Sequence, residues 1–195
     1  MRQTERARRA LERAESETDE IRRSLWLAKA ADLGITGNAV LVGGAAVNLH
    51  TGSYRPTDVD MCAFLDQNDR EALEELGFRR LQGDQFEYSF EDGERWLLEF
   101  PDRVVDGQIS RIALDDREIL EVIRLESLIV DRVVQATDKT NTTFDEAIRL
   151  CVAVFERTDW AWVDREIKRR DSNEPALGLG DVYAKVISRT KALSV

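Results

Sequence analysis

The sequence is poor in the residues that build most metal and disulfide sites. It contains one histidine, His50, and two cysteines, Cys62 and Cys151, among 195 residues. A single histidine excludes a His-rich metal centre, and neither cysteine has a second Cys or His at ligand spacing. We therefore expect two buried thiols that behave as small apolar side chains.

Long hydrophobic runs and excess positive charge are also missing. No stretch of eighteen consecutive apolar residues occurs, so no membrane-spanning helix is expected. The first sixteen residues, MRQTERARRALERAES, lack the apolar segment of a secretory signal, which makes the cytoplasm the expected location. The net charge of −10 marks an acidic protein and argues against binding to the phosphate backbone of nucleic acids.

The hydrophobic pattern predicts a mixed α/β (α+β) fold. Apolar spacing indicates one long helix at the start, and short apolar stretches between glycine turns then indicate strands. The pattern turns helical after about residue 117. We predict an α/β core with an N-terminal helix over 1–116 and a helical C-terminal region, 117–195, packed on that core. The expected helices cover 3–33, 45–50, 68–76, 118–137, 144–158, 160–169 and 179–193, and the expected strands cover 39–42, 58–65, 78–81, 85–90, 95–100 and about 109–114.

Two carboxylates open an apolar strand within the segment LVGGAAVNLHTGSYRPTDVDMCAF, residues 41–64. Asp58 and Asp60 are two positions apart, so in an extended strand both side chains point to the same face. Two neighbouring carboxylates repel and are costly to bury, so a positive partner is expected beside them. Arg55 could provide that charge, and so could a hard divalent cation, which prefers oxygen ligands.

A third acid and a glycine pair strengthen the cation interpretation. Glu99 lies in the strand Arg95–Phe100, where its apolar neighbours make a charged side chain unusual. Three carboxylates from two strands could form one face of an octahedral metal site. Gly43 and Gly44 directly precede the short helix predicted at 45–50, and backbone N–H groups at a helix N-terminus can bind phosphate.

Other classes of protein also use an Asp-x-Asp motif. Phosphatases with an aspartate nucleophile place the pair at the carboxyl end of an apolar strand, whereas here the apolar run follows the acids. Glycosyltransferases that use nucleotide sugars need a larger nucleotide-binding domain upstream than 57 residues provide. A calcium loop of the EF-hand type requires a glycine and a terminal glutamate that this segment lacks.

The order of Gly43-Gly44, His50, Arg55, Thr57, Asp58 and Asp60 resembles the signature of the polymerase-β-like nucleotidyltransferase superfamily. The match is tight over 41–61, looser to about 155, and is nearest to the small members that include abortive-infection toxin-type and antibiotic nucleotidyltransferases. The resemblance implies that Asp58, Asp60 and Glu99 are catalytic and bind two Mg²⁺ ions, with Mn²⁺ as an alternative. It further implies that Gly43, Gly44, Arg55 and Thr57 bind the nucleotide, and it matches Glu126 and Arg132 to an acid and a base on the helix after the sheet.

The activity expected from this resemblance is metal-dependent transfer of a nucleoside monophosphate from an NTP to an unknown acceptor. The presence of three acids favours activity, because a protein that only binds has no chemical need for them. Two alternatives stay open: a non-catalytic nucleotide- or partner-binding module of the same fold, and a toxin–antitoxin component that depends on a partner chain. Either a protein partner or a homodimer is compatible with the sequence.

Overall fold

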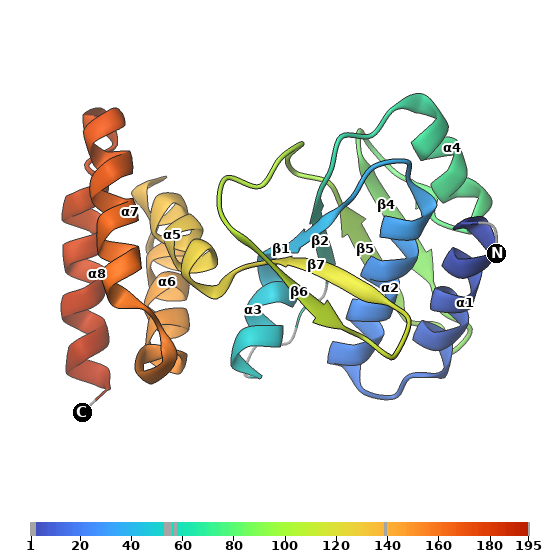
Figure 1. Cartoon of the computed structure of the whole chain (residues 1–195), viewed down its shortest axis with the longest axis horizontal. Helices are drawn as coiled ribbons and strands as arrows, with labels where there is room; N and C mark the ends of the chain where they lie inside the picture. The colour runs from blue at the N-terminus through green and yellow to red at the C-terminus, as the bar shows by residue number, and fades with distance from the viewer. Residues whose placement is uncertain (1–2, 53–55, 57, 139, 195) are drawn as a thin grey trace. The chain divides into compact units, whose positions relative to one another are not determined.

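The computed structural model describes residues 3–52, 56, 58–138 and 140–194, which form two compact units, 1–123 and 124–195. Figure 1 shows that the first unit contains the sheet and that the second is helical. The predicted mixed α+β fold class is confirmed. Within the described ranges, no helix is long and apolar enough to cross a membrane.

The described part of the first unit contains a seven-stranded mixed sheet with the strand order β3-β4-β5-β2-β1-β7-β6. At its centre, β2 runs antiparallel to β1 and parallel to β5, and β7 runs parallel to β1. The outer pairs β3–β4, β4–β5 and β6–β7 are antiparallel. The strands are β1 (Val40–Val42), β2 (Asp58–Cys62), β3 (Arg79–Arg80), β4 (Gln85–Ser89), β5 (Arg95–Glu99), β6 (Ile109–Ala113) and β7 (Ile119–Ile123).

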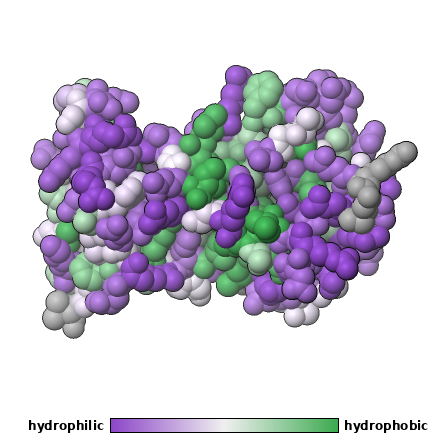
Figure 2. Space-filling model, in the orientation of Figure 1, coloured by the Kyte–Doolittle hydropathy of each residue, from purple (hydrophilic) through white to green (hydrophobic). Residues whose placement is uncertain are grey.

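The two faces of this sheet differ in chemistry. On one face Leu41, Met61 and Leu98 are completely buried, and α2 packs against β2 and β7. The opposite face carries the carboxylates together with exposed Leu97 and Ile119, and Figure 2 shows apolar surface gathered over the strands in its view. Because side chains alternate across each strand, the acids share their face with buried residues such as Val40 and Cys62, whereas Leu41, Met61 and Leu98 lie on the other face. The helices of this unit are α1 (Gln3–Ser16), α2 (Glu20–Gly34), α3 (Gly43–Thr51) and α4 (Gln67–Glu75).

The prediction of a single helix over 3–33 is wrong. The segment forms two helices, α1 and α2, which pack against each other. Asp19 has an extended backbone, and its side chain accepts a hydrogen bond of 3.0 Å from the backbone N–H of Arg22. This N-cap begins a new helix without any glycine or proline in the sequence.

The predicted helix over 118–137 is wrong in its first third. Residues Ile119–Ile123 form β7, and α5 begins only at Leu125. Because β7 pairs with β1 and β6, it belongs to the sheet, and the two units divide at 123/124 rather than at 116/117. The backbone of Arg124, with ψ of 146°, separates the strand from the helix.

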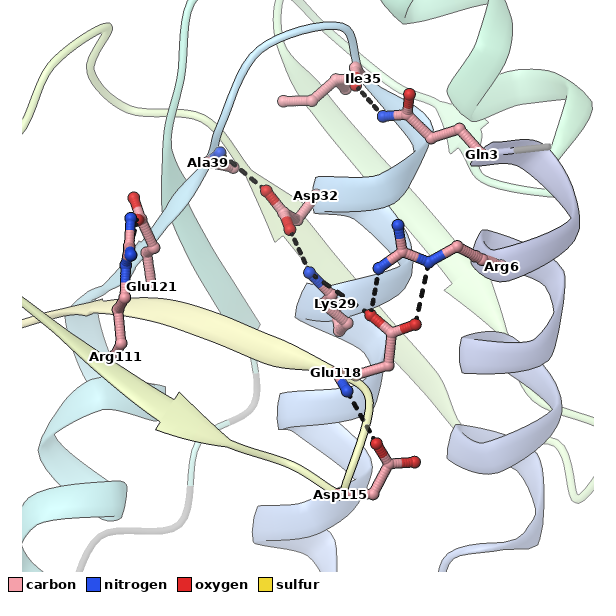
Figure 3. A network of polar contacts seen from close by, with 10 residues as sticks. All are labelled: Gln3, Arg6, Lys29, Asp32, Ile35, Ala39, Arg111, Asp115, Glu118 and Glu121. Carbon is pink, nitrogen blue, oxygen red and sulfur yellow. Dashed lines mark hydrogen bonds and ion pairs between the residues drawn. The ribbon is translucent and has the colours of Figure 1, made fainter. Parts of the chain in front are cut away.

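A network of ion pairs joins α1, α2 and the turn between β6 and β7 (Figure 3). Glu118 accepts hydrogen bonds of 3.0 and 2.8 Å from the guanidinium of Arg6. The ammonium of Lys29 lies 2.7 Å from one carboxylate oxygen of Asp32 and 3.8 Å from Glu118. The other oxygen of Asp32 accepts a hydrogen bond of 3.0 Å from the backbone N–H of Ala39, just before β1. The network thus ties the helical layer to two strands of the sheet.

The second unit consists of helices that pack around a small core containing Val133, Cys151 and Val186. Both cysteines of the chain are free and buried, as expected, and burial raises the pKa of the Cys151 thiol to about 12. The helices are α5 (Leu125–Gln135), α6 (Asn141–Ala153), α7 (Trp160–Asn173) and α8 (Leu179–Leu193), with short 3-10 turns at Ala136–Asp138, Phe155–Arg157 and Pro175–Leu177.

Glu166 on α7 makes the stability of the second unit sensitive to acid. Hydrogen bonds from Arg169, together with those from Arg170, lower the pKa of Glu166 from 4.5 to about 2. Because the folded pKa is depressed, this stabilisation is present above pH 4.5 and is lost as the pH falls toward 2. We expect Glu166→Gln to lower the free energy of unfolding by about 1 kcal/mol at pH 7, after solvent screening.

The measurement is urea unfolding of wild type and Glu166→Gln at pH 7 and at pH 3, with exposed Glu174→Gln as the control. The difference between wild type and Glu166→Gln should shrink at the lower pH, whereas the control should match wild type at both. An equal difference at the two pH values would contradict the assignment.

Candidate active site

Asp58 and Asp60 lie on the same face of β2, at the centre of the sheet. Their side chains are half-buried, whereas Val59 between them is completely buried on the opposite face. In the parallel pair with β5, Asp60 lies directly opposite Glu99 and Asp58 opposite Leu97. Residues paired across neighbouring strands share a face, so the backbone places all three carboxylates on one side of the sheet.

The carboxylate of Asp60 lies against the first residue of α3. Gly43 has a φ of +62°, and a Cβ atom added to it would be 1.8 Å from Oδ2 and 2.7 Å from Cβ of Asp60. No residue with a side chain fits there unless Asp60 moves, so glycine is required by both conformation and space. The glycine predicted to admit a phosphate therefore also admits a carboxylate of the protein itself.

The N-terminus of α3 provides a favourable environment for negative charge. Its first turn has no side-chain cap, because the N-cap residue is Val42. Unpaired N–H groups and the helix dipole stabilise an anion at this end. Asp60 lies at this point, and Gly44, the second residue of the helix, is buried. The same feature suits a phosphate group, as predicted from Gly43 and Gly44.

Glu99 has a hydrogen-bond partner on the side away from Asp60. Its Oε1 accepts a hydrogen bond of 3.0 Å from Nε2 of Gln85, its register partner on β4. Among the described residues, no three His, Cys, Asp or Glu side chains come close enough together to hold a metal ion. The oxygen ligands of Asp58, Asp60 and Glu99, which share one face of the sheet, are of the type that a divalent cation prefers. The three carboxylates can converge on a cation only if the side chain of Glu99 leaves Gln85.

Of the remaining residues predicted for the first unit, the structure describes His50, whereas Arg55 and Thr57 lie outside the described residues. The ring Nε2 of His50 lies 3.1 Å from the backbone oxygen of Ile123, at the end of β7. This contact joins α3 to the sheet and agrees with a structural role for His50.

Glu126 and Arg132, matched by resemblance, belong to α5 in the second unit. Glu126 is buried, accepts a hydrogen bond of 3.2 Å from the backbone N–H of Asp159, and lies 2.8 Å from the guanidinium of Arg124. Arg132 donates to the side chain of Gln135 at 2.6 Å. Both side chains therefore have partners within their own unit, and the contacts of Glu126 secure the start of α7.

Gln85 is the residue near the site that the sequence did not reveal. It begins the strand predicted at 85–90, and an exposed glutamine there carries no chemical signal of its own. Its importance comes from the β4–β5 register, which pairs Gln85 with Glu99. The turn at Asp92-Gly93, which joins β4 to β5, could have suggested this pair only if both strand boundaries had been known.

Comparison with known proteins supports the fold. No protein-family model matches the sequence, and no curated protein matches it. A crystal structure of an antigenic nucleotidyltransferase-like protein from Paracoccidioides brasiliensis is similar, with a TM-score of 0.53 and 15% sequence identity over 90% of this chain and 94% of that one. A sequence identity of 15% supports a common fold only, so the function has to be argued from the residues of the site. The chain therefore has a nucleotidyltransferase-like fold.

Proposed function

We propose that the protein is a metal-dependent nucleotidyltransferase that transfers a nucleoside monophosphate from an NTP to an acceptor. The observation that carries this proposal is the placement of Asp58, Asp60 and Glu99 on one face of β2 and β5, beside the glycine start of α3. The nucleotidyltransferase-like fold agrees with it. Once Glu99 leaves Gln85, three carboxylates on one face of the sheet would suit a pair of divalent cations and a triphosphate.

Each predicted site residue has a distinct role in this proposal. Asp58 and Asp60 hold the cations, Mg²⁺ or Mn²⁺, which when bound stabilise the charge that develops on the transferred phosphate and on pyrophosphate. Glu99 completes the ligand set after it leaves Gln85. The N–H groups of Gly43 and Gly44 orient the triphosphate at the start of α3. Arg55, whose planar guanidinium suits bidentate contact, pairs with a phosphate group of the nucleotide. Thr57 contacts the same phosphate group.

The position of an isotope label in the NTP distinguishes transfer of the nucleoside monophosphate from transfer of the γ-phosphate. Wild type is incubated with Mg²⁺, an extract that supplies acceptors, and NTPs labelled at either the α- or the γ-phosphorus. We expect label to reach an acceptor only from the α position. Asp60→Asn should lower the rate at least about 100-fold, because metal ligation supplies several kcal/mol to the transition state. Transfer of γ label, or equal rates in Asp60→Asn, would contradict the proposal.

A second candidate function is a nucleotide-binding module without catalysis. The hydrogen bond between Gln85 and Glu99 favours it, because it holds the third carboxylate away from the other two. This module would bind Mg²⁺ and NTP through Asp58 and Asp60 and would transfer no label. NTP binding by a chain that is inactive with every acceptor would therefore support this candidate over the enzyme.

A further inference from the structure

A pocket of about 390 Å³ opens beyond the carboxyl ends of β2 and β5 in the first unit. These two strands are parallel, and ligands of α/β sheets commonly bind just outside the carboxyl ends of their strands. The backbone N–H of Ala63 donates a hydrogen bond of 3.0 Å to the carbonyl oxygen of Asp102, which joins the segments that leave the two strands. We call this hollow the strand-end pocket; its walls include Phe64, Arg70, Asp84, Pro101, Arg103 and Val104.

The strand-end pocket combines exposed apolar surface with an available cation. Phe64 and Val104 are 58% and 77% exposed, so the pocket presents apolar surface to solvent. The guanidinium carbon of Arg103 lies 5.1 Å from the centre of the Phe64 ring. A cation stacked on an aromatic face keeps its N–H groups at the edge, where they can form bidentate bonds to an anion.

The charges around the pocket identify which cation can take a ligand. Arg70 donates to both carboxylate oxygens of Asp84, at 2.7 and 3.2 Å, so each neutralises the other. Arg103, by contrast, forms no ion pair within the described part of the chain, although Asp102, its neighbour in sequence, also lines the pocket. Because Arg103 lines the pocket and stacks on Phe64 while its charge has no carboxylate partner among the described residues, it can pair with a negatively charged ligand in the pocket.

The pocket also lies next to one of the three carboxylates. A second hollow of about 440 Å³ is lined by Glu99 and shares Asp84, Phe100 and Pro101 with the strand-end pocket. A molecule anchored on Arg103 and Phe64 would therefore lie at the end of the sheet where Glu99 is the last residue of β5. The volume of the strand-end pocket suits a small molecule, since pockets for such ligands measure about 300–1,000 Å³.

We propose that the strand-end pocket binds the acceptor, and that this acceptor is a small organic anion. It carries a carboxylate or phosphate that pairs with Arg103, a flat or apolar body that covers Phe64 and Val104, and a free hydroxyl. The proposal rests on the proposed function. In the reaction, the hydroxyl oxygen forms a bond to the α-phosphorus of the NTP, the bond from that phosphorus to the bridging oxygen breaks, pyrophosphate leaves, and the hydroxyl proton passes to the carboxylate of Glu99.

Binding is tested on the full chain with three probes of similar shape: 4-hydroxyphenylacetate, phenyl phosphate and the amine tyramine. Two-dimensional amide spectra locate each probe, and titration gives its dissociation constant. We expect one or both anions to shift the signals of 63–65 and 102–104, and tyramine to leave them unchanged. Arg103→Gln should weaken binding of the anion at least about tenfold, the effect of losing a charged hydrogen bond. Arg79→Gln, which removes the same charge from an exposed arginine paired with Glu87, should have no effect.

The outcomes separate this proposal from the proposed function. Equal binding of tyramine, the absence of shifts with both anions, or wild-type affinity in Arg103→Gln would overturn the anion site. The relative response to 4-hydroxyphenylacetate and phenyl phosphate decides between carboxylate and phosphate. Calorimetry with Mg²⁺ and NTP on the same samples tests the other claim: binding of the anion without binding of NTP would overturn the acceptor role and the proposed function, while binding of NTP alone would overturn only the anion site.

Discussion

Gly43→Ala should destabilise the protein by about 2–5 kcal/mol and abolish nucleotide binding. Two physical effects add in this variant. A φ of +62° costs a residue with a side chain about 1–2 kcal/mol. The new methyl group would also lie 1.8 Å from Oδ2 and 2.7 Å from Cβ of Asp60. A change of rotamer moves the carboxylate but not Cβ, so β2 itself must shift, and such overpacking typically costs about 1–3 kcal/mol.

Gly52 provides a matched control for Gly43. It has nearly the same φ, +64°, but a Cβ atom added to it would meet nothing within 4 Å. Gly52→Ala should therefore cost only the conformational part, about 1–2 kcal/mol. Urea unfolding of both variants, and of Gly43→Ala combined with Asp60→Gly, isolates the contact. If the two alanine variants were equally stable, or if Asp60→Gly recovered none of the loss, Asp60 would not lie against α3.

Asp32→Asn should lower the free energy of unfolding by about 2–4 kcal/mol. The side chain of Lys29 is only 7% exposed, and its ammonium relies on Asp32 at 2.7 Å, since Glu118 is more distant at 3.8 Å. Loss of one partner from a buried ion pair leaves an uncompensated charge, which costs about 3–5 kcal/mol when no second partner remains. Asparagine keeps an oxygen that can accept the hydrogen bond from the N–H of Ala39. The loss in free energy of unfolding therefore measures the effect of the missing charge.

The pair Arg111–Glu121, also drawn in Figure 3, is the control for this substitution. Its atoms are equally close, at 2.8 Å, but the side chain of Arg111 is 73% exposed. Glu121→Gln should therefore cost less than about 1 kcal/mol. Equal losses of stability in Asp32→Asn and Glu121→Gln, measured by urea unfolding at pH 7, would show that burial does not set the strength of the network.

Elements bounded by strong local signals could be predicted from the sequence. The strands of the β4–β5 hairpin lie on either side of Asp92-Gly93, and α4 ends before Gly77, whose φ is +99°. Boundaries without glycine or proline could not be predicted. Asp19 starts a helix with a single side-chain hydrogen bond, and Ile119–Ile123 is a mainly apolar stretch that continues into the helical pattern of α5. Its strand conformation comes from pairing with β1, which is a tertiary contact.

The candidate site divides in the same way. The spacing of Asp58 and Asp60 fixes their common face, because side chains alternate along any strand. The positions of Glu99 opposite Asp60, and of Asp60 against Gly43, depend on how β2 pairs with β5 and how α3 follows β1. Such contacts between distant parts of the chain have no local signature. The role of Gln85 as a partner of Glu99 could not be predicted for the same reason.

Binding of Mg²⁺ together with a non-hydrolysable NTP, measured by calorimetry, tests the central claim most directly. Wild type is compared with Asp58→Asn/Asp60→Asn, and with Glu74→Gln/Glu75→Gln, which removes two exposed charges from α4. We predict Mg²⁺-dependent binding by wild type and by the α4 variant, and affinity more than about 100-fold weaker in the aspartate variant, since even indirect support of a metal ligand contributes 10- to 100-fold. The absence of binding by folded wild type to every NTP, or equal affinity in the aspartate variant, would contradict the nucleotide site on β2.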